Sequence, residues 1–427
     1  MDMRLLPMLA VLYLLSFLDR GNIGNAKIEG LQEDLNMSPS QYNLCLTIFF
    51  FTYAAFEVPS NLLLKKLRPS RWLPLIMVCW GIVVTLTGLV QSFHGLLAAR
   101  LFLGVMEVGL FLGVALRQAL FFSAASAAGA FSGLLAFAIS KMDGVGGLAG
   151  WRWIFILEGI ATVLVAVVAL FLLYDFPQTA NFLTEEERAF VVHRLKYQGQ
   201  FQIPADGAAE HVRVARRLKN LNRCPLYGIS LFLPTIVKSL GYTSSTAQLM
   251  TVPIYITAAV LAVISAYFSD KVGKRSPFII GCFLLMIVGY SLCIASSNPR
   301  VVYGGIFLAA GAIYPALPGA VTWLSNNLSG SYKRSAGMAI QIGIGNLGGA
   351  MASNFYRQAD MPRYTLGHGL ELGFISLGII AGLVLILSYY TVNKKRTQRL
   401  ENGEAARFTP EELSALGDKA ITFRYML

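Results

Sequence analysis

Long apolar runs separated by short polar segments dominate the chain. They predict twelve helices, which cover residues 5–28, 42–63, 73–92, 95–116, 119–141, 152–174, 224–238, 246–268, 277–296, 301–323, 335–356 and 368–391. A helix that crosses a membrane needs about 20 mostly apolar residues, and all of these runs except 224–238 come close to that length. The hydropathy pattern therefore predicts an all-α membrane protein.

One long polar stretch divides these runs into two groups of six. The expected domains are a first six-helix bundle at 1–174, a cytoplasmic linker at 175–223, a second six-helix bundle at 224–391 and a cytoplasmic tail at 392–427. Thr184 and Glu187 form a T-x-x-E capping box, which predicts an amphipathic helix near 184–197 within the linker.

The two groups of helices show a weak internal repeat. A basic loop follows the second predicted helix (KKLRPSR, 65–71), and another follows the eighth (DKVGKR, 270–275). Such a repeat is typical of transporters in which two related bundles enclose a binding site near the membrane midplane.

Composition supports a membrane protein and sets its orientation. Hydrophobic residues make up 55% of the chain and charged residues only 14%, whereas a soluble domain carries about 25% charged residues. Most of the 35 Lys and Arg residues lie in the tail and in the loops on the same side of the membrane as both termini. The positive-inside rule therefore predicts cytoplasmic termini, and the net charge of +12 does not require a nucleic acid partner.

Four charged residues lie well inside the first and fourth predicted membrane helices. Asp19 and Arg20 stand about 15 residues into the first helix, and Arg100 and Glu107 share one face of the fourth. Insertion of one charged side chain near the centre of a membrane helix costs about 2.5–3.5 kcal/mol of free energy. Either they form ion pairs that fix helix packing, or an arginine binds an anionic substrate while the carboxylates exchange protons. We favour the second interpretation, because ionisable residues inside membranes are functional by default.

Three uncharged residues are further candidates for the lining of a binding site. Gln341 and Asn346 in the eleventh helix could hold helices together or line a cavity. Pro315 and Pro318 predict a kink in the tenth helix, and such breaks often lie beside a substrate, which makes Tyr314 a candidate. A kink that serves packing alone explains the prolines equally well.

Motifs for an enzyme or for a metal site are missing from the sequence. It contains no Ser/His/Asp set, no H-x-x-x-H and no G-x-x-x-x-G-K-[ST] phosphate loop, and its five cysteines lack metal-ligand spacing. We therefore expect no enzyme activity, no cofactor and no metal. The expected partners are the lipid bilayer, a proton and a small solute, and we expect a monomer.

Several long strings in the sequence resemble one family of transporters. LDRGNIGNA (18–26), FFFTYAAFEVPSN (49–61), RLFLGVMEVG (100–109), GWRWIFILEG (150–159) and AIQIGIGNLGGAMASNFYR (339–357) are similar to the fungal anion:cation symporters of the major facilitator superfamily. The allantoate and nicotinate permeases of that family are the most similar group. The resemblance covers nearly the whole chain.

The resemblance implies a twelve-helix rocker-switch fold of two six-helix bundles. It also implies proton-coupled uptake of small organic anions, such as carboxylated heterocycles or ureides, across the plasma membrane. The family's substrate contacts correspond to Arg20, Tyr53 and Asn346, and its protonation network to Asp19, Arg100 and Glu107.

The same resemblance assigns a conformational role to a loop. DKVGKR is similar to the cytoplasmic gate motif of the superfamily, which implies a switching role for Asp270, Gly273 and Arg275.

The chain departs from the family pattern in two places. The fourth and fifth helices meet around Arg117 with almost no loop, and the seventh begins abruptly at Cys224 with about 15 apolar positions. We therefore expect shortened helices 4/5 and 7. Two other functions stay open, namely an exporter of an acidic secondary metabolite and a nutrient sensor or transport-dead membrane protein.

Overall fold

The computed structural model describes residues 2–67, 69–107, 118–173, 184–190, 224–329, 331–409, 412–413 and 416–427. The predicted junction of helices 4 and 5 around Arg117, most of the predicted linker, and the chain that precedes Cys224 lie outside the described residues. Thr184 and Glu187 lie within them, and each backbone N–H of this pair bonds to the other side chain, at 3.1 and 3.3 Å. The predicted capping box is therefore confirmed.

The described residues are almost entirely helical. The first part of the chain forms α1 (Asp2–Ile28), α2 (Leu31–Asp34), α3 (Pro39–Lys66), α4 (Pro69–Thr87), α5 (Phe93–Met106), α6 (Gln118–Ile139) and α7 (Gly150–Leu172). The second part forms α10 (Cys224–Ser239), α11 (Ser244–Val272), α12 (Ser276–Ala295), α13 (Pro299–Asn326), α14 (Ser331–Ala352) and α15 (Thr365–Glu401). Seven helices within the described ranges, α4, α6, α7, α11, α12, α13 and α15, are long and apolar enough to cross a membrane. The all-helical membrane fold is confirmed, and the count of twelve spans stays a prediction.

One helix extends beyond its predicted end, and another contains the two prolines at which a kink was predicted. α15 continues ten residues past the predicted end at 391, because Lys, Arg, Gln and Leu in KKRTQRLE are good helix formers outside the membrane as well. α13 runs through Pro315 and Pro318 as one helix. A proline removes one backbone hydrogen bond, and neighbouring helices in a bundle tolerate this loss.

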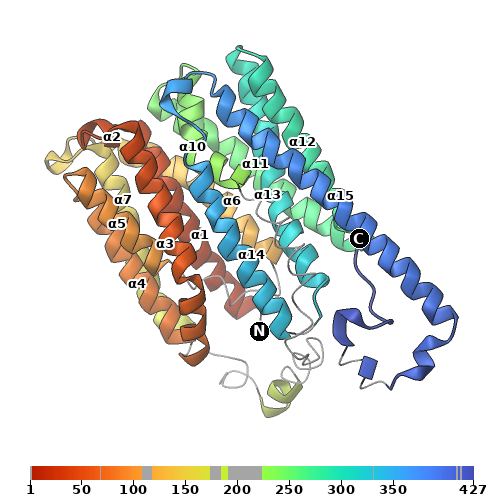
Figure 1. Cartoon of the computed structure of the whole chain (residues 1–427). Coiled ribbons are helices and arrows are strands. Elements are labelled where there is room, and N and C mark those ends of the chain that lie inside the picture. Colours follow the sequence, from red (N-terminus) through yellow and green to blue (C-terminus); the bar gives the residue numbers. More distant parts are fainter. Residues whose placement is uncertain are drawn as a thin grey trace.

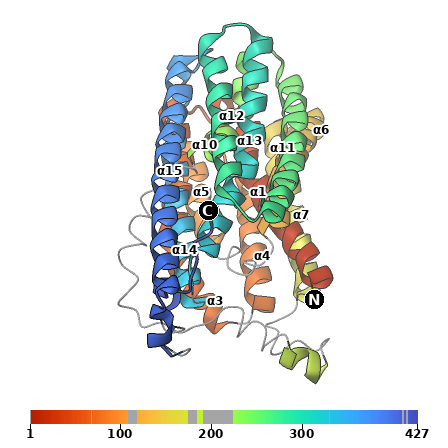
Figure 2. The same ribbon diagram turned by 90° about the vertical axis from the view of Figure 1, so that its right-hand side faces the viewer.

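The long helices form one bundle with two distinct ends (Figures 1 and 2). We call the end that carries α2 the α2 end, and the opposite end, where α1 begins and α15 finishes, the tail end. In the first part of the chain, α4 packs on α7, α3 on α5, and α1 on α6 and α7. In the second, α12 packs on α13 and α15, and α11 on α13. The two halves meet where α6 packs on α11, α3 on α14 and α1 on α10.

Glycines bring the two halves into close contact. A Cβ atom added at Gly24 of α1 would lie 2.6 Å from the carbonyl oxygen of Leu231 in α10. One added at Gly133 of α6 would lie 2.6 Å from Thr251 Oγ1 and 2.8 Å from the carbonyl oxygen of Gln248, both in α11. These distances are too short for any side chain, so both helix pairs pack with glycine at the point of contact.

Hydrogen bonds join the halves at the α2 end. The carbonyl oxygen of Ile28 accepts bonds from Lys238 Nζ and from Ser244 Oγ, both at 2.8 Å. Gln248 Nε2 donates to Glu29 Oε1 at 3.0 Å. Burial raises the pKa of the Glu29 carboxyl, and the nearby Lys238 charge partly opposes that rise. We call these contacts the α2-end clasp.

The last eleven residues fold back onto the tail end. Arg396 of α15 donates to the carbonyl oxygens of Phe423 at 2.9 Å and Asp418 at 2.7 Å. The buried Asp418 carboxylate also pairs with Lys333 of α14 at 2.6 Å. The Tyr425 ring lies under the Arg396 guanidinium, 4.9 Å from its central carbon. The tail is thus bound to α14 and α15.

The final two residues reach further helices. Met426 exchanges hydrogen bonds with the Asn327 side chain at 2.7 and 3.1 Å, and its carbonyl oxygen also accepts from Trp323 Nε1 at 2.8 Å. The backbone N–H of Arg275, just before α12, donates to the Leu427 carbonyl oxygen at 2.9 Å. The tail therefore joins the ends of α12, α13, α14 and α15.

The glycine contact between α6 and α11 can be tested by substitution. Gly133→Val should lower the thermal unfolding midpoint of the purified protein, because overpacking at a closed contact costs about 1–3 kcal/mol. Gly281→Val in α12 is the matched control, since no atom lies within 4 Å of a Cβ at that position. Equal midpoints for the two variants would contradict the close contact.

The docking of the tail can be tested by limited proteolysis. Arg396→Ala removes two charge-assisted hydrogen bonds, each worth about 1.5–3 kcal/mol. Trypsin should therefore cleave after Lys419 and Arg424 at least about tenfold faster, because cleavage follows the undocked population. Arg399→Ala, which removes an exposed arginine one turn later, should leave these cleavage rates unchanged. Equal rates in the two variants would show that Arg396 does not hold the tail.

Candidate functional site

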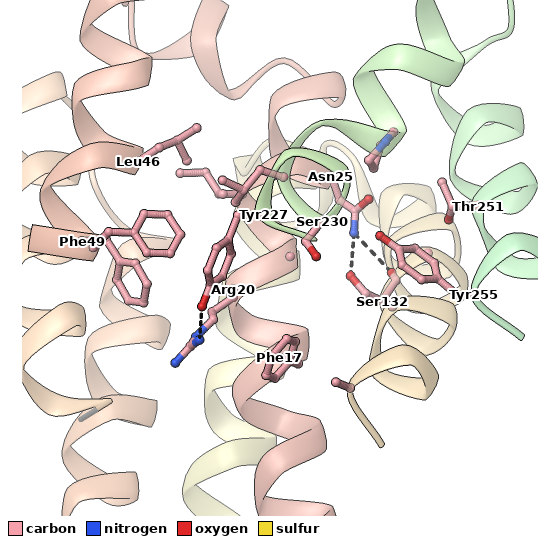
Figure 3. Close-up of a pocket in the computed structure, with 18 of the residues that line it drawn as sticks. Phe17, Arg20, Asn25, Leu46, Phe49, Ser132, Tyr227, Ser230, Thr251 and Tyr255 are labelled. Atoms are coloured by element: carbon pink, nitrogen blue, oxygen red, sulfur yellow. Dashed lines mark hydrogen bonds between the residues drawn. The ribbon is translucent and has the colours of Figure 1, made fainter. Parts of the chain in front are cut away.

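A cavity of about 730 Å³ lies between the two halves. Helices α1, α3, α5 and α6 of the first half and α10, α11 and α13 of the second half contribute side chains to it (Figure 3). Its walls are largely apolar and aromatic, and a few polar groups interrupt them: Asn25, Ser132, Ser230, Thr251, Tyr227, Tyr255 and Tyr314. Its charged lining residues, within the described part of the chain, are Arg20 and Arg100. The described lining of the cavity is therefore electropositive, because both of its charged residues are cations.

Arg20 projects from α1 into the middle of the bundle. Its Nε pairs with Glu107 Oε1 at 2.5 Å, and Glu107 also accepts a bond from Ser16 Oγ at 2.5 Å. Its Nη1 lies 3.5 Å from the hydroxyl oxygen of Tyr227 on α10. The pair compensates both charges, and both side chains are buried. The Nε contact leaves the terminal nitrogens on the cavity side.

Aromatic rings surround the Arg20 guanidinium. Its central carbon lies 4.8 Å from the ring centre of Tyr53, 5.4 Å from that of Phe17 and 5.6 Å from that of Phe49. Cation–π contacts of this kind stabilise an arginine by about 0.5–2 kcal/mol each without occupying its N–H groups. The rings therefore fix the guanidinium without using its N–H groups, two of which already contact Glu107 and Tyr227.

Arg100 is the second cation of the cavity. It is only 3% exposed on α5, and its Nε and Nη2 have no hydrogen-bond partner among the described residues. Its guanidinium lies 5.8 Å from the centre of the Phe155 ring. A buried cation without an anion is costly, and a bound carboxylate would remove that cost.

Two buried carboxylates lie behind the cavity and do not line it. Asp19 accepts a bond from Thr162 Oγ1 of α7 at 3.3 Å. Glu158 of α7 accepts a bond from the Asn22 side chain. Both acids face neutral donors, so they differ from Glu107, which faces Arg20.

A row of neutral polar side chains connects Glu158 with the cavity. Asn25 Nδ2 donates to Ser132 Oγ at 2.7 Å, and Ser132 donates in turn to Asn22 Oδ1 at 3.1 Å. Asn25 and Ser132 lie at the cavity wall, and Asn22 reaches Glu158 (Figure 3). Sequence analysis missed this row. The spacing of Asp19, Asn22 and Asn25, three residues apart on one helix face, was the available signal.

The structure brings most of the predicted substrate contacts together. The Tyr53 ring contacts the Arg20 guanidinium. Asn346 of α14 accepts a bond from the Tyr227 hydroxyl at 2.5 Å, so Tyr227 lies between Asn346 and Arg20. Tyr314 lines the cavity, and its hydroxyl lies 3.3 Å from Ser230 Oγ. Gln341 is buried on α14 and is not among the cavity-lining residues.

Tyr227 is a contact that sequence analysis missed. It contributes to the cavity from α10, and its hydroxyl connects α1 of the first half with α14 of the second. Nothing in the sequence near Tyr227 marks this role, because its partners Arg20 and Asn346 are more than a hundred positions away.

The predicted gate residues lie together at the tail end, away from the cavity. Asp270 and Arg275 form an ion pair. Gly273 ends α11 with a positive φ of 69°, a conformation that glycine adopts without strain. The turn between α11 and α12 is therefore fixed by all three residues. Their role in switching stays a prediction.

Comparisons with known proteins give a consistent result. A sequence profile described as Major Facilitator Superfamily matches residues 9–221 and 220–426. MFS-type transporter cnsO of Penicillium expansum is 35% identical and aligns with 100% of this chain and 89% of its own length. The high-affinity nicotinic acid transporter of Saccharomyces cerevisiae is 32% identical, with 100% and 84% covered. The matches are to transporters, which confirms that the chain is not an enzyme.

Solved structures agree on the fold. A bacterial homolog of the human lysosomal transporter Spinster, in an inward-facing and occupied conformation, has a TM-score of 0.67 at 18% identity, with 90% of this chain and 95% of that chain covered. A D-xylose–proton symporter has a TM-score of 0.65 at 15% identity, with 88% and 96% covered.

Proposed function

The chain belongs to the major facilitator superfamily of membrane transporters, and we propose that it couples the uptake of a small organic anion to protons across the plasma membrane. Within the superfamily, we place it with the fungal anion:cation symporters that its sequence strings resemble. The proposed architecture has twelve spans in two six-helix bundles, a cytoplasmic linker and tail, and both termini in the cytoplasm.

The electropositive cavity is the observation that carries this proposal. Two arginines line it, and its described walls contain no carboxylate. An anion that leaves water loses its hydration and needs a cation partner in the low-dielectric interior. Arg100 has no ion-pair or hydrogen-bond partner at Nε or Nη2 among the described residues, and Arg20 lines the same cavity, so both arginines are available to a carboxylate. A relative that transports nicotinic acid supports a carboxylate substrate.

Glu107 is the residue that we propose binds the coupling proton. A substrate carboxylate and the Glu107 carboxylate compete for the same guanidinium, because Glu107 holds Arg20 at 2.5 Å. Protonation of Glu107 removes its charge and weakens its hold on Arg20, which then binds the substrate more strongly. Substrate and proton therefore favour each other's binding, which is the thermodynamic requirement for coupled transport.

The contacts between the halves fit a rocking mechanism. The α2-end clasp joins the halves through hydrogen bonds between the ends of α1, α10 and α11. With cytoplasmic termini, the α2 end lies outside the cell, and this conformation is closed to that side. Opening to the outside requires the clasp to break. At the opposite end of the bundle, we assign a role in the same conformational change to the turn of Asp270, Gly273 and Arg275.

Substitution of Arg20 tests the anion site. Arg20→Ala should reduce uptake of labelled nicotinate, allantoate or another transported acid by at least about thirtyfold, because loss of a buried charge partner costs about 2–5 kcal/mol. Arg300→Ala, at an exposed position in the first turn of α13, should transport at the wild-type rate. Wild-type uptake by Arg20→Ala would refute the site. Flux out of vesicles driven by a pH gradient would instead favour an exporter.

Substitution of Glu107 tests proton coupling. Glu107→Gln keeps the bond to Ser16 but removes the charge that responds to protons. Exchange of labelled for unlabelled substrate across vesicles should persist, while accumulation driven by a pH gradient should be lost. Glu33→Gln, on the exposed face of α2, is the control and should retain both activities. Gradient-driven accumulation in Glu107→Gln would exclude Glu107 as the coupling group.

A further inference from the structure

A buried acid outside the proposed substrate site is the most unusual ionisable group in the second half of the chain. Glu371 lies on α15, about two turns from its start, and is 0% exposed. Neither of its carboxyl oxygens has a hydrogen-bond partner among the described residues. This isolation distinguishes Glu371 from Glu107, Asp19 and Glu158, each of which accepts a hydrogen bond.

Every described element packed around Glu371 presents an uncharged group to it. The titratable groups that face it are Cys224 of α10, Tyr290 of α12, Tyr356 in the turn after α14, and His368 one turn earlier on α15. His368 Nδ1 lies 3.3 Å from the Tyr356 hydroxyl, and its ring packs between those of Tyr356 and Tyr290. The described surroundings therefore contain no lysine or arginine that could neutralise an ionised Glu371.

An ionised carboxylate in this position would be strongly disfavoured. A buried charge with neither a hydrogen bond nor a counter-ion costs at least several kcal/mol, and such groups bind a proton instead. Burial of a protonated carboxyl group costs far less free energy, because that group is neutral.

Gly228 of α10 shapes the site. A Cβ atom at Gly228 would overlap Glu371 Oε1, so the carboxyl group packs directly on the α10 backbone. α10 is also the helix that carries Tyr227, the next residue, to Arg20 and Asn346. Two neighbouring positions of one helix, about 100° apart around its axis, thus contact the proposed substrate site and Glu371.

α10 connects these sites mechanically. It packs on α1 of the first half and on α11, α14 and α15 of its own half (Figure 2). If α10 follows α1 when the halves rock, its distance from α15 would change. That shift would open the Gly228 contact and give Glu371 access to water or to a donor.

We propose that Glu371 is a second proton-binding site, which carries a proton in this conformation and exchanges it when α10 moves away from α15. The exchange step rests on the proposed transport function, whereas the bound proton does not. Glu371 does not contact the substrate cavity, since it is not among the described lining residues. It would act on transport through the proton that it binds.

Infrared spectroscopy of the purified full chain tests the bound proton. At neutral pH, the wild-type spectrum should contain a carboxylic acid C=O band that Glu371→Gln removes and Glu371→Asp shifts. Gly228→Ala should also shift this band, because the added methyl group displaces the carboxyl. Glu33→Gln is the exposed control and should leave the band unchanged. A wild-type spectrum without this band, or an unchanged band in Glu371→Gln, would overturn the proposal without any transport measurement.

Reconstituted vesicles test the exchange step. A pH-sensitive dye and labelled substrate measured together give the number of protons moved with each anion. Glu371→Gln should lower this ratio and flatten the pH dependence of uptake while substrate exchange continues, and Glu371→Asp should restore both. An unchanged ratio and pH profile in Glu371→Gln would overturn the exchange step. If the wild type moves no anion at all, the proposed transport function fails, and the infrared result still decides whether Glu371 holds a proton.

Discussion

The cost of burying charge controls the organisation of this protein's interior. A membrane helix bundle offers ionisable groups little water, so each group needs a counter-ion, a hydrogen bond or a proton. Arg20 and Glu107 neutralise one another, Arg100 retains unused donors, and Glu371 has no partner among the described residues. These three situations correspond to three different tasks: a pair that responds to protons, a cation available to an anion, and an acid that is stable only when neutral. A bound anion or proton can stabilise this interior because its charges are incompletely compensated.

The contacts between the halves have a different character. Gly24 and Gly133 permit close backbone contact, and the clasp at the α2 end uses the Ile28 carbonyl oxygen and the Glu29 carboxyl group as acceptors. Such contacts are individually weak and break without leaving a charge deep in the bilayer. Discrete rearrangements of packed domains depend on interfaces of this kind. The strong ion pair between Arg20 and Glu107 lies within the first half, so it does not oppose separation of the halves.

The sequence predicted the helices and the principal charges well, because both signals are local. Apolar runs of membrane length mark helices, and Arg20 and Glu107 were conspicuous as charges inside such runs. Tyr227 and Glu371 were not recognised for opposite reasons. A tyrosine in an apolar helix carries no signal until its partners on other helices are known. Glu371 lies close to the polar start of its span, where a carboxylate is ordinarily hydrated.

The limits of sequence analysis are also visible at α14 and α15. Gln341 and Asn346 lie five positions apart on α14, and only the family resemblance distinguished Asn346 from Gln341. The structure places Asn346 on Tyr227 and leaves Gln341 outside the described cavity wall. α15 was predicted to finish with its apolar run at 391, but helix propensity and the bound tail extend it to Glu401.

The docked tail has a practical consequence for the handling of this protein. The Leu427 carbonyl oxygen bonds to the backbone beside the Asp270–Arg275 turn, and Met426 is held by Asn327 and Trp323. A fluorescent protein or an affinity tag fused directly after Leu427 would begin beside these hydrogen bonds, where Met426 and Leu427 are half-buried. It would pull on the α11–α12 turn and disturb the motion under study. Fusions therefore belong at the other terminus, or behind a long flexible spacer.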